Sequence, residues 1–344
     1  MRMNSLIFIG LLALAIAPLF GQPVNQNGPI YWTKSQPNCA GLANGGVTTV
    51  LNGPATVGYA CYVTGTFVWL AAGGVAGNPA HWSSAIRVAA PSSAPIGVEY
   101  SFFTVEGNTQ RLDATVNGGS SVQSGTSAGF ALAANQPLEV ELLGESRDAP
   151  AYANTATGSV NAKFLCPDEN TCANVLPQLI YSALPTYPWS LSVPIAWRGE
   201  LSSQWSAEGI DDGLTNVVSL VIYNGDTQSA AFNVFVYDSN GNLAGSGTTP
   251  TIQSEQFTGT GEGGTYGVLL SQVVSPLPSG IFKILIDGPS RSAVEVLQVN
   301  GPSATTLQVS PDSAPASQTA RAVRYRGVNK PEIAPSQVLP PVPK

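Results

Sequence analysis

The sequence predicts an all-β protein that is built from two tandem antiparallel β-sandwich domains. Apolar and polar residues alternate in short segments such as Leu138–Leu142, and this period of two is typical of a strand with one buried and one solvated face. Turn residues (Gly, Pro, Asn and Asp) follow such segments roughly every 8 to 12 residues, as in sandwich folds. The length of 344 residues is about twice that of an average domain, which allows two of them.

The composition disfavours helices and most enzyme classes. Only 10% of the residues are charged, whereas Gly (36) and Pro (27) are frequent. One His, four Cys and two Met offer few groups for a metal site or for proton transfer. We therefore expect a protein without catalytic activity, without a metal ion and without a cofactor.

The first residues have the features of a secretory signal peptide. Arg2 precedes an apolar run that starts at Leu6, and the small residue Gly21 offers a cleavage site. The run from Leu6 to Phe20 has 15 residues, fewer than the roughly 18 to 20 that cross a bilayer. We expect cleavage after Gly21, which removes residues 1–21 and leaves a periplasmic, cell-surface or extracellular chain without a membrane span. An uncleaved membrane anchor is the alternative.

Four cysteines agree with export, because disulfide bonds form and persist in oxidising compartments. They allow three pairings, and nearness in the sequence favours Cys39 with Cys61 and Cys166 with Cys172. A zinc site is the alternative, but it needs more closely spaced cysteines or more than a single histidine. Because all four cysteines fall in the first half, we expect residues 22–173 to form a disulfide-stapled β-sandwich domain.

A repeat of the strand pattern, offset by about 134 residues, divides the body of the chain into two domains. Each copy has a strand, a polar turn and a second strand that runs into Gly-Asn. The second domain is expected over residues 174–309, with Ser192–Ile195 near its first strand. The aligned segments are 82–108 with 216–242, 137–144 with 280–288, and 159–162 with 293–296.

Charge is distributed unevenly along the chain. Residues 22–309 carry 8 basic and 19 acidic side chains, whereas residues 310–344 carry 5 basic and 2 acidic ones together with many prolines. The acidic body argues against nucleic acid as a partner, because binding to phosphates requires clustered Lys and Arg. The Pro-rich basic tail has no periodic apolar face and is expected to be disordered. Its alternative role is that of a tether to an acidic surface.

Three segments carry a resemblance to a known group of proteins: Ser192–Ile195 (SVPI), Gly213–Asn224 (GLTNVVSLVIYN) and Tyr237–Asn242 (YDSNGN). In these segments the chain resembles uncharacterised tandem β-sandwich proteins that bacteria secrete. The resemblance extends over most of residues 190–309 and, more weakly, over residues 66–166. It implies immunoglobulin-like or fibronectin-like domains, and it implies no catalytic residues.

Two short motifs point to chemistry without the context that this chemistry requires. Gly125–Gly129 fits the G-x-S-x-G pattern of serine hydrolases, with Ser127 as the nucleophile. His81 precedes this serine, however, and the residues after Gly129 have a strand pattern, so we expect a Gly/Ser-rich loop. Asp238–Asn242 offers oxygen ligands at alternate positions, as in a calcium loop, but Asn-Gly after a strand favours a hairpin turn.

Aromatic residues are concentrated between the two predicted sandwiches, where Tyr187, Trp189, Trp197 and Trp205 lie. Flat rings beside polar side chains stack on sugars, and binding sites often form where domains meet. These four residues are therefore possible ligand-binding aromatics. The alternative interpretation is that their rings fill the cores and the contact between the domains.

Together these features predict a secreted, non-catalytic protein that acts through surface recognition or as a scaffold in the cell envelope or extracellular space. Its partner is expected to be a protein or a glycan at the cell surface. The first alternative is a carbohydrate-binding protein that uses the aromatics between the sandwiches. A serine hydrolase that uses Ser127 is the second.

Overall fold

The computed structural model describes most of the chain between residues 37 and 311. The predicted signal peptide, His81 and residues 312–344 lie outside the described residues, so the predictions made for them stay predictions. The described residues are 37, 39, 46–48, 57–73, 82–89, 95–119, 122–144, 156–183, 187–198, 201–212, 216–255, 262–300, 304–307 and 309–311.

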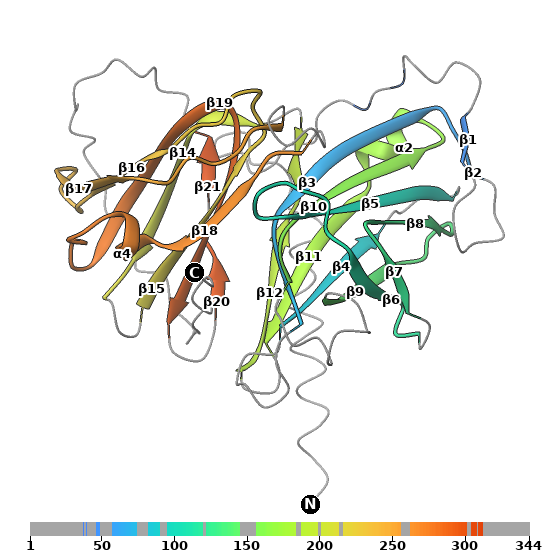
Figure 1. Ribbon diagram of the computed structural model, residues 1–344, viewed down its shortest axis with the longest axis horizontal. Helices are drawn as coiled ribbons and strands as arrows, with labels where there is room; N and C mark the ends of the chain where they lie inside the picture. Colours follow the sequence, from blue (N-terminus) through green and yellow to red (C-terminus); the bar gives the residue numbers. More distant parts are fainter. Residues whose placement is uncertain are drawn as a thin grey trace, which may run out of the picture.

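In the first half of the chain, two antiparallel sheets share one core (Figure 1). The first sheet contains β3 (Cys61–Ala72), β5 (Ile96–Thr104), β8 (Ser127–Leu132), β10 (Ala156–Cys166) and β13 (Ala196–Trp197). The second contains β4 (Ser83–Ala89), β6 (Leu112–Val116), β7 (Gln123–Gly125), β9 (Leu138–Gly144), β11 (Leu176–Ala183) and β12 (Tyr187–Pro194). Their strand orders are β13-β3-β10-β5-β8 and β12-β11-β4-β9-β6-β7. β1 (Gly46–Thr48) and β2 (Val57–Tyr59) form a separate pair.

The residues in this core have the alternation that the sequence predicts. On β9, Leu138, Val140 and Leu142 are buried, whereas Glu139 and Glu141 are partly exposed on the other face. Because both sheets contribute alternate side chains to the same hydrophobic cluster, the first half is a β-sandwich.

The second half is also antiparallel and is organised around one long strand. Its strands are β14 (Ser202–Ile210), β15 (Asn216–Asn224), β16 (Asn233–Tyr237), β17 (Leu243–Thr248), β18 (Thr265–Leu269), β19 (Ile281–Asn300), β20 (Ala304–Thr306) and β21 (Val309–Pro311). The early part of β19 pairs with β14 and β16, and its later part pairs with β15 and β20. A second hydrophobic cluster, which includes Trp205, Phe232 and Phe282, lies among these strands. Two short helices, α2 (Glu169–Ala173) and α4 (Leu270–Val273), complete the described elements, so the predicted all-β class is confirmed.

The predicted boundary between the halves is wrong. β11, β12 and β13 all follow residue 173, where the first domain was expected to end, yet β11 pairs with β4 and β13 pairs with β3. Leu179, Leu191 and Val193 are buried in the first core. The segment Ser192–Ile195 therefore closes the first sandwich instead of opening the second. The last cysteine marked the end of the disulfides, but it did not mark the end of the sheet.

The predicted alignment of the repeat does not agree with the strand pairing. The alignment matches β4 with β15, and it matches β9 with residues 280–288, which include the early part of β19. Because β4 pairs with β9, the alignment predicts that β15 pairs with the early part of β19. Instead β15 pairs with β18 and with Ser292–Asn300, and β16 takes the early part. Short alternating strands resemble one another, so a shift by one strand leaves the hydrophobic pattern intact.

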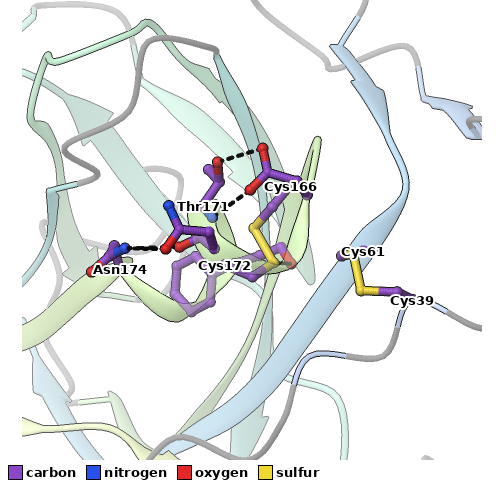
Figure 2. The surroundings of a disulfide bond; sticks show 9 residues. Cys39, Cys61, Cys166, Thr171, Cys172 and Asn174 are labelled. Atoms are coloured by element: carbon purple, nitrogen blue, oxygen red, sulfur yellow. Dashed lines mark hydrogen bonds between the residues drawn. A yellow bond between two sulfur atoms is a disulfide. The ribbon is translucent and has the colours of Figure 1, made fainter.

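Both predicted disulfide pairs form, and they meet at one end of the first sandwich (Figure 2). Cys39 joins Cys61 with Cα atoms 4.1 Å apart, and Cys166 joins Cys172 with Cα atoms 5.4 Å apart. Cys61 and Cys166 are opposite one another in the pairing of β3 with β10. Asp168 caps the short helix that carries Cys172 by accepting a hydrogen bond from Thr171 N at 2.7 Å.

The two halves contact each other closely. Val221, Tyr223, Ala293 and Leu297 of the second half belong to the same hydrophobic cluster as the first core. The backbone of Thr265 donates to the carbonyl of Val105 at 2.8 Å, and its hydroxyl donates to the carbonyl of Val68 at 2.9 Å. These two hydrogen bonds fix the position of β18 against β3 and against the end of β5.

Candidate ligand-binding groove

The predicted ligand-binding aromatics do not form a site. Trp197 is 3% exposed and packs edge-on against Phe164, with ring centroids 5.9 Å apart, inside the first core. Trp205 is 2% exposed, and its Nε1 donates to Ser292 Oγ at 3.1 Å inside the second core. Both therefore fill cores, and their interpretation as ligand-binding residues is wrong. Tyr187 and Trp189 lie on β12, and their side chains are outside the described residues.

The serine motif has the geometry of a strand junction. Ser127 is exposed at the start of β8, and Gly129 continues that strand instead of entering a helix. The carbonyl of Thr126 accepts a hydrogen bond from Phe102 N at 3.0 Å, which ties this motif into the sheet. A strained strand-to-helix turn, which a nucleophile elbow requires, is not what this segment forms.

Asp238–Asn242 forms a turn held by its own side chain. Asp238 Oδ1 accepts from the backbone N of Asn240 at 2.8 Å and of Asn242 at 2.9 Å. These donors lower the pKa of Asp238. The carboxylate thus stabilises the hairpin, as the turn interpretation predicts. In the part of the chain that the structure describes, no group of three or more His, Cys, Asp or Glu could hold a metal ion, and no helix is long and apolar enough to cross a membrane.

A polar cluster lies where the two halves meet. Glu262, which is 1% exposed, accepts from Thr66 Oγ1 at 2.9 Å, from Asn161 Nδ2 at 2.8 Å and from Arg198 Nη2. The other terminal nitrogen of Arg198 lies 2.9 Å from Glu255 Oε1. Burial raises the pKa of Glu255. Since the three donors come from the first half and both carboxylates from the second, this cluster joins the halves and leaves no free acid–base pair.

A groove of about 590 Å³ lies on the solvent face of the sheet that contains β4, β9 and β11. This volume is within the range of small-ligand sites. The lining residues come from β4, the turn after β6, the start of β9 and the start of β11. They are Arg87, Val88, Ala89, Asn117, Gly118, Pro137, Leu138, Glu139, Leu176 and Gln178.

Four of these residues form a polar row across the strands. Gln178 is opposite Arg87 in the pairing of β11 with β4, and Arg87 is opposite Glu139 in the pairing of β4 with β9. Adjacent strands are about 4.8 Å apart, so these three side chains span about 10 Å perpendicular to the strands. Asn117 extends the row, because its Oδ1 accepts from Glu139 N at 2.8 Å.

The turn after β6 fixes the position of Asn117. Asn117 has a φ of 48° and Gly118 a φ of 68°, and the backbone N of Gly119 donates to the carbonyl of Val116 at 2.8 Å. Two consecutive residues at positive φ define a tight turn in which Asn-Gly is strongly preferred. The backbone N of Asn117 also donates to the carbonyl of Glu139 at 2.8 Å, so its side chain is held over β9.

In the polar row the charges of Arg87 and Glu139 compensate each other, and several polar atoms make no hydrogen bond to another described residue. Arg87 Nε pairs with Glu139 Oε2, and the two side chains are 51% and 37% exposed. An ion pair this exposed contributes little to stability. Gln178 Oε1 accepts from Ser192 Oγ at 2.7 Å. Among the described residues, the amide nitrogens of Gln178 and Asn117, the terminal nitrogens of Arg87 and Glu139 Oε1 have no partner.

An apolar strip runs beside this row on the same face of the sheet, two residues further along the strands. It consists of Leu176, Ala89 and Pro137, and Leu176 is 37% exposed. Leu176 is opposite Ala89 in the pairing of β11 with β4. The sequence interpretation placed Glu139 on a solvated face, which is correct, but it did not find the groove. Only the strand register brings these residues together from four separate segments.

The fold and the groove define the class: a disulfide-stapled, all-β protein with an open amphipathic groove on one sheet. Comparison of the chain with protein families, with curated proteins and with solved structures gives no match in any of the three. The function is therefore argued from the groove itself.

Proposed function

We propose that this protein is a secreted, non-catalytic recognition protein, which presents the groove between β4, β9 and β11 to a partner outside the cell. The observation that carries the proposal is the polar row. It places amide, guanidinium and carboxylate groups with unused hydrogen-bonding atoms on a rigid sheet. Binding groups held on regular elements need little ordering when a ligand arrives.

Export is supported by the two disulfides, since such bonds are rare in reducing compartments. The signal-like residues 1–21 agree with it. This proposal includes the domain type that the resemblance implies, immunoglobulin-like or fibronectin-like, and a Pro-rich tail that extends from the folded body.

The two alternative functions have less support. Carbohydrate binding through the central aromatics cannot use Trp197 and Trp205, because both side chains are buried. A serine hydrolase of the G-x-S-x-G type requires a strained strand-to-helix turn at the nucleophile, whereas Ser127 begins strand β8. A scaffold without a specific ligand does not require a row of unengaged polar groups on one sheet face.

The test is binding of the labelled full-length protein to the particulate extracellular fraction of cultures that produce it. The double variant Arg87→Met/Glu139→Gln removes both charges of the groove but keeps the unbranched stem of Arg87 and the size of the Glu139 side chain. We expect it to reduce the bound fraction strongly. Equal binding of the variant and the wild type contradicts recognition through this groove.

A matched control variant is available on the other sheet. Lys163 Nζ lies 3.3 Å from Glu99 Oε2, and both side chains are 38% exposed. Lys163→Met/Glu99→Gln removes a similarly exposed ion pair that does not line the groove. It is expected to bind like the wild type, so a loss in this control as well assigns the effect to general surface charge.

A further inference from the structure

The groove differs from sites for anions and for peptide strands. The charge of Arg87 is compensated by Glu139, so the groove presents no uncompensated positive charge to an anionic ligand. The body of the protein is acidic, which disfavours anions further. β4 is paired on both sides, with β9 and β11, so the floor of the groove has no free backbone edge to which a peptide strand could be added.

The groove has the features that an uncharged sugar chain requires. Hydroxyl groups both donate and accept hydrogen bonds, and the polar row offers donors at Gln178, Arg87 and Asn117 and an acceptor at Glu139. The apolar strip offers aliphatic surface for the C–H faces of the rings. A row that crosses three strands spans about 10 Å, which is long enough for about two sugar units.

We propose that the groove binds an uncharged oligosaccharide that lies across the strands, with its hydroxyl groups on the polar row and its ring faces on the apolar strip. This inference rests on the proposed recognition function and names its ligand class. The site is distinct from the central aromatics, and it consists of Gln178, Arg87, Glu139 and Asn117 beside Leu176, Ala89 and Pro137.

The experiment is native affinity electrophoresis of the full-length protein in gels that contain a single polysaccharide. The probes are a neutral β-glucan, a neutral galactomannan and anionic alginate. We expect at least one neutral polymer to retard the protein, and we expect added sodium chloride to leave this retardation unchanged, since screening weakens only charge–charge attraction. Retardation by alginate alone, abolished by salt, overturns the proposal.

Variants locate the binding. Arg87→Met/Glu139→Gln removes hydrogen bonds to hydroxyl groups and is expected to weaken binding about tenfold. Lys163→Met/Glu99→Gln is expected to stay within about twofold of the wild type, because this ion pair does not line the groove. Asn117→Asp keeps the acceptor for Glu139 N but removes the amide donors, and it is expected to weaken binding as well. Wild-type binding by both groove variants overturns the assignment of the site.

Different results contradict the proposed ligand class and the proposed recognition function. If no neutral polymer retards the protein while Arg87→Met/Glu139→Gln still abolishes binding to the extracellular fraction, the ligand class is wrong and the recognition function stands. If the groove variant binds that fraction like the wild type, the recognition function is wrong, whatever the gels show.

Discussion

Glu295 is a buried carboxyl group whose protonation should control stability. It lies on β19, is 5% exposed, and its Oε1 has no hydrogen-bond partner in the described part of the chain. Its neighbours on the same face of the strand, Ala293 and Leu297, belong to the core that includes the first half, whereas Val294 and Val296 face the second core. Burial raises the pKa of Glu295 from its ordinary value of 4.5 to about 8.

The direction of the pH dependence follows from this shift. Between pH 4.5 and about 8 the folded chain keeps the proton on Glu295, whereas the unfolded chain has lost it. Unfolding then releases a proton, so the free energy of unfolding falls as the pH rises through this interval and is constant above it. One pH unit corresponds to about 1.4 kcal/mol, so the loss between pH 4.5 and pH 7 is about 3 kcal/mol.

The variant Glu295→Gln has no proton to release and keeps the size of the side chain. We expect the difference in unfolding free energy, variant minus wild type, to increase by about 3 kcal/mol from pH 4 to pH 7. Urea unfolding curves of both proteins at both pH values measure this increase. Any effect of the amide on packing is the same at the two pH values, so it does not contribute to the increase. The exposed Glu208 on β14 supplies the control Glu208→Gln, for which we expect a change below about 0.5 kcal/mol. A difference for Glu295→Gln that is equal at the two pH values refutes the reasoning.

Three further changes test the contact between the halves and the cross-links. A Cβ at Gly267 would lie 2.8 Å from the Trp69 ring, so Gly267→Ala should lower the free energy of unfolding by about 1 to 3 kcal/mol, as measured by urea unfolding. An unchanged midpoint of the urea unfolding curve would show that the ring can move. Glu262→Gln removes the buried charge opposite Arg198 and should cost about 3 kcal/mol by the same measurement, and a cost below about 1 kcal/mol contradicts the role of the cluster. Replacement of Cys166 and Cys172 by serine opens a short loop and should cost about 2 kcal/mol; calorimetry that gives the wild-type melting temperature contradicts this value.

The sequence predicted what depends on local pattern and spacing. Strand alternation at Leu138–Leu142 and the two disulfide pairs follow from neighbouring residues, and both are present. Pairing partners depend on packing between distant segments, and neither the repeat alignment nor the boundary at residue 173 contained this information. The tryptophans illustrate the same limit, because a ring in a strand can point into a core or toward a ligand with the same local sequence.

Glu295 shows why burial could not be derived from periodicity alone. Val294 and Val296 alternate with it, and a simple alternating pattern places the charged residue in water. In the structure the outer face of β19 and β15 packs against the first half, so that both faces of these strands are buried. Alternation predicts a solvated face for a strand in an isolated sandwich, but here the other half of the chain packs against that face.

The same packing determines which surface remains for recognition. Thr66 of β3 and Asn161 of β10 bond to Glu262, so the second half covers part of the outer face of the β3–β10 sheet. The outer face of the β4–β9–β11 sheet stays accessible at the groove. Because the first sandwich has two outer faces and one is used to hold the second half, the groove occupies the face that a ligand can reach. Glu262→Gln, which weakens the contact between the halves, should therefore leave binding in the groove intact, since the polar row belongs to the first half alone.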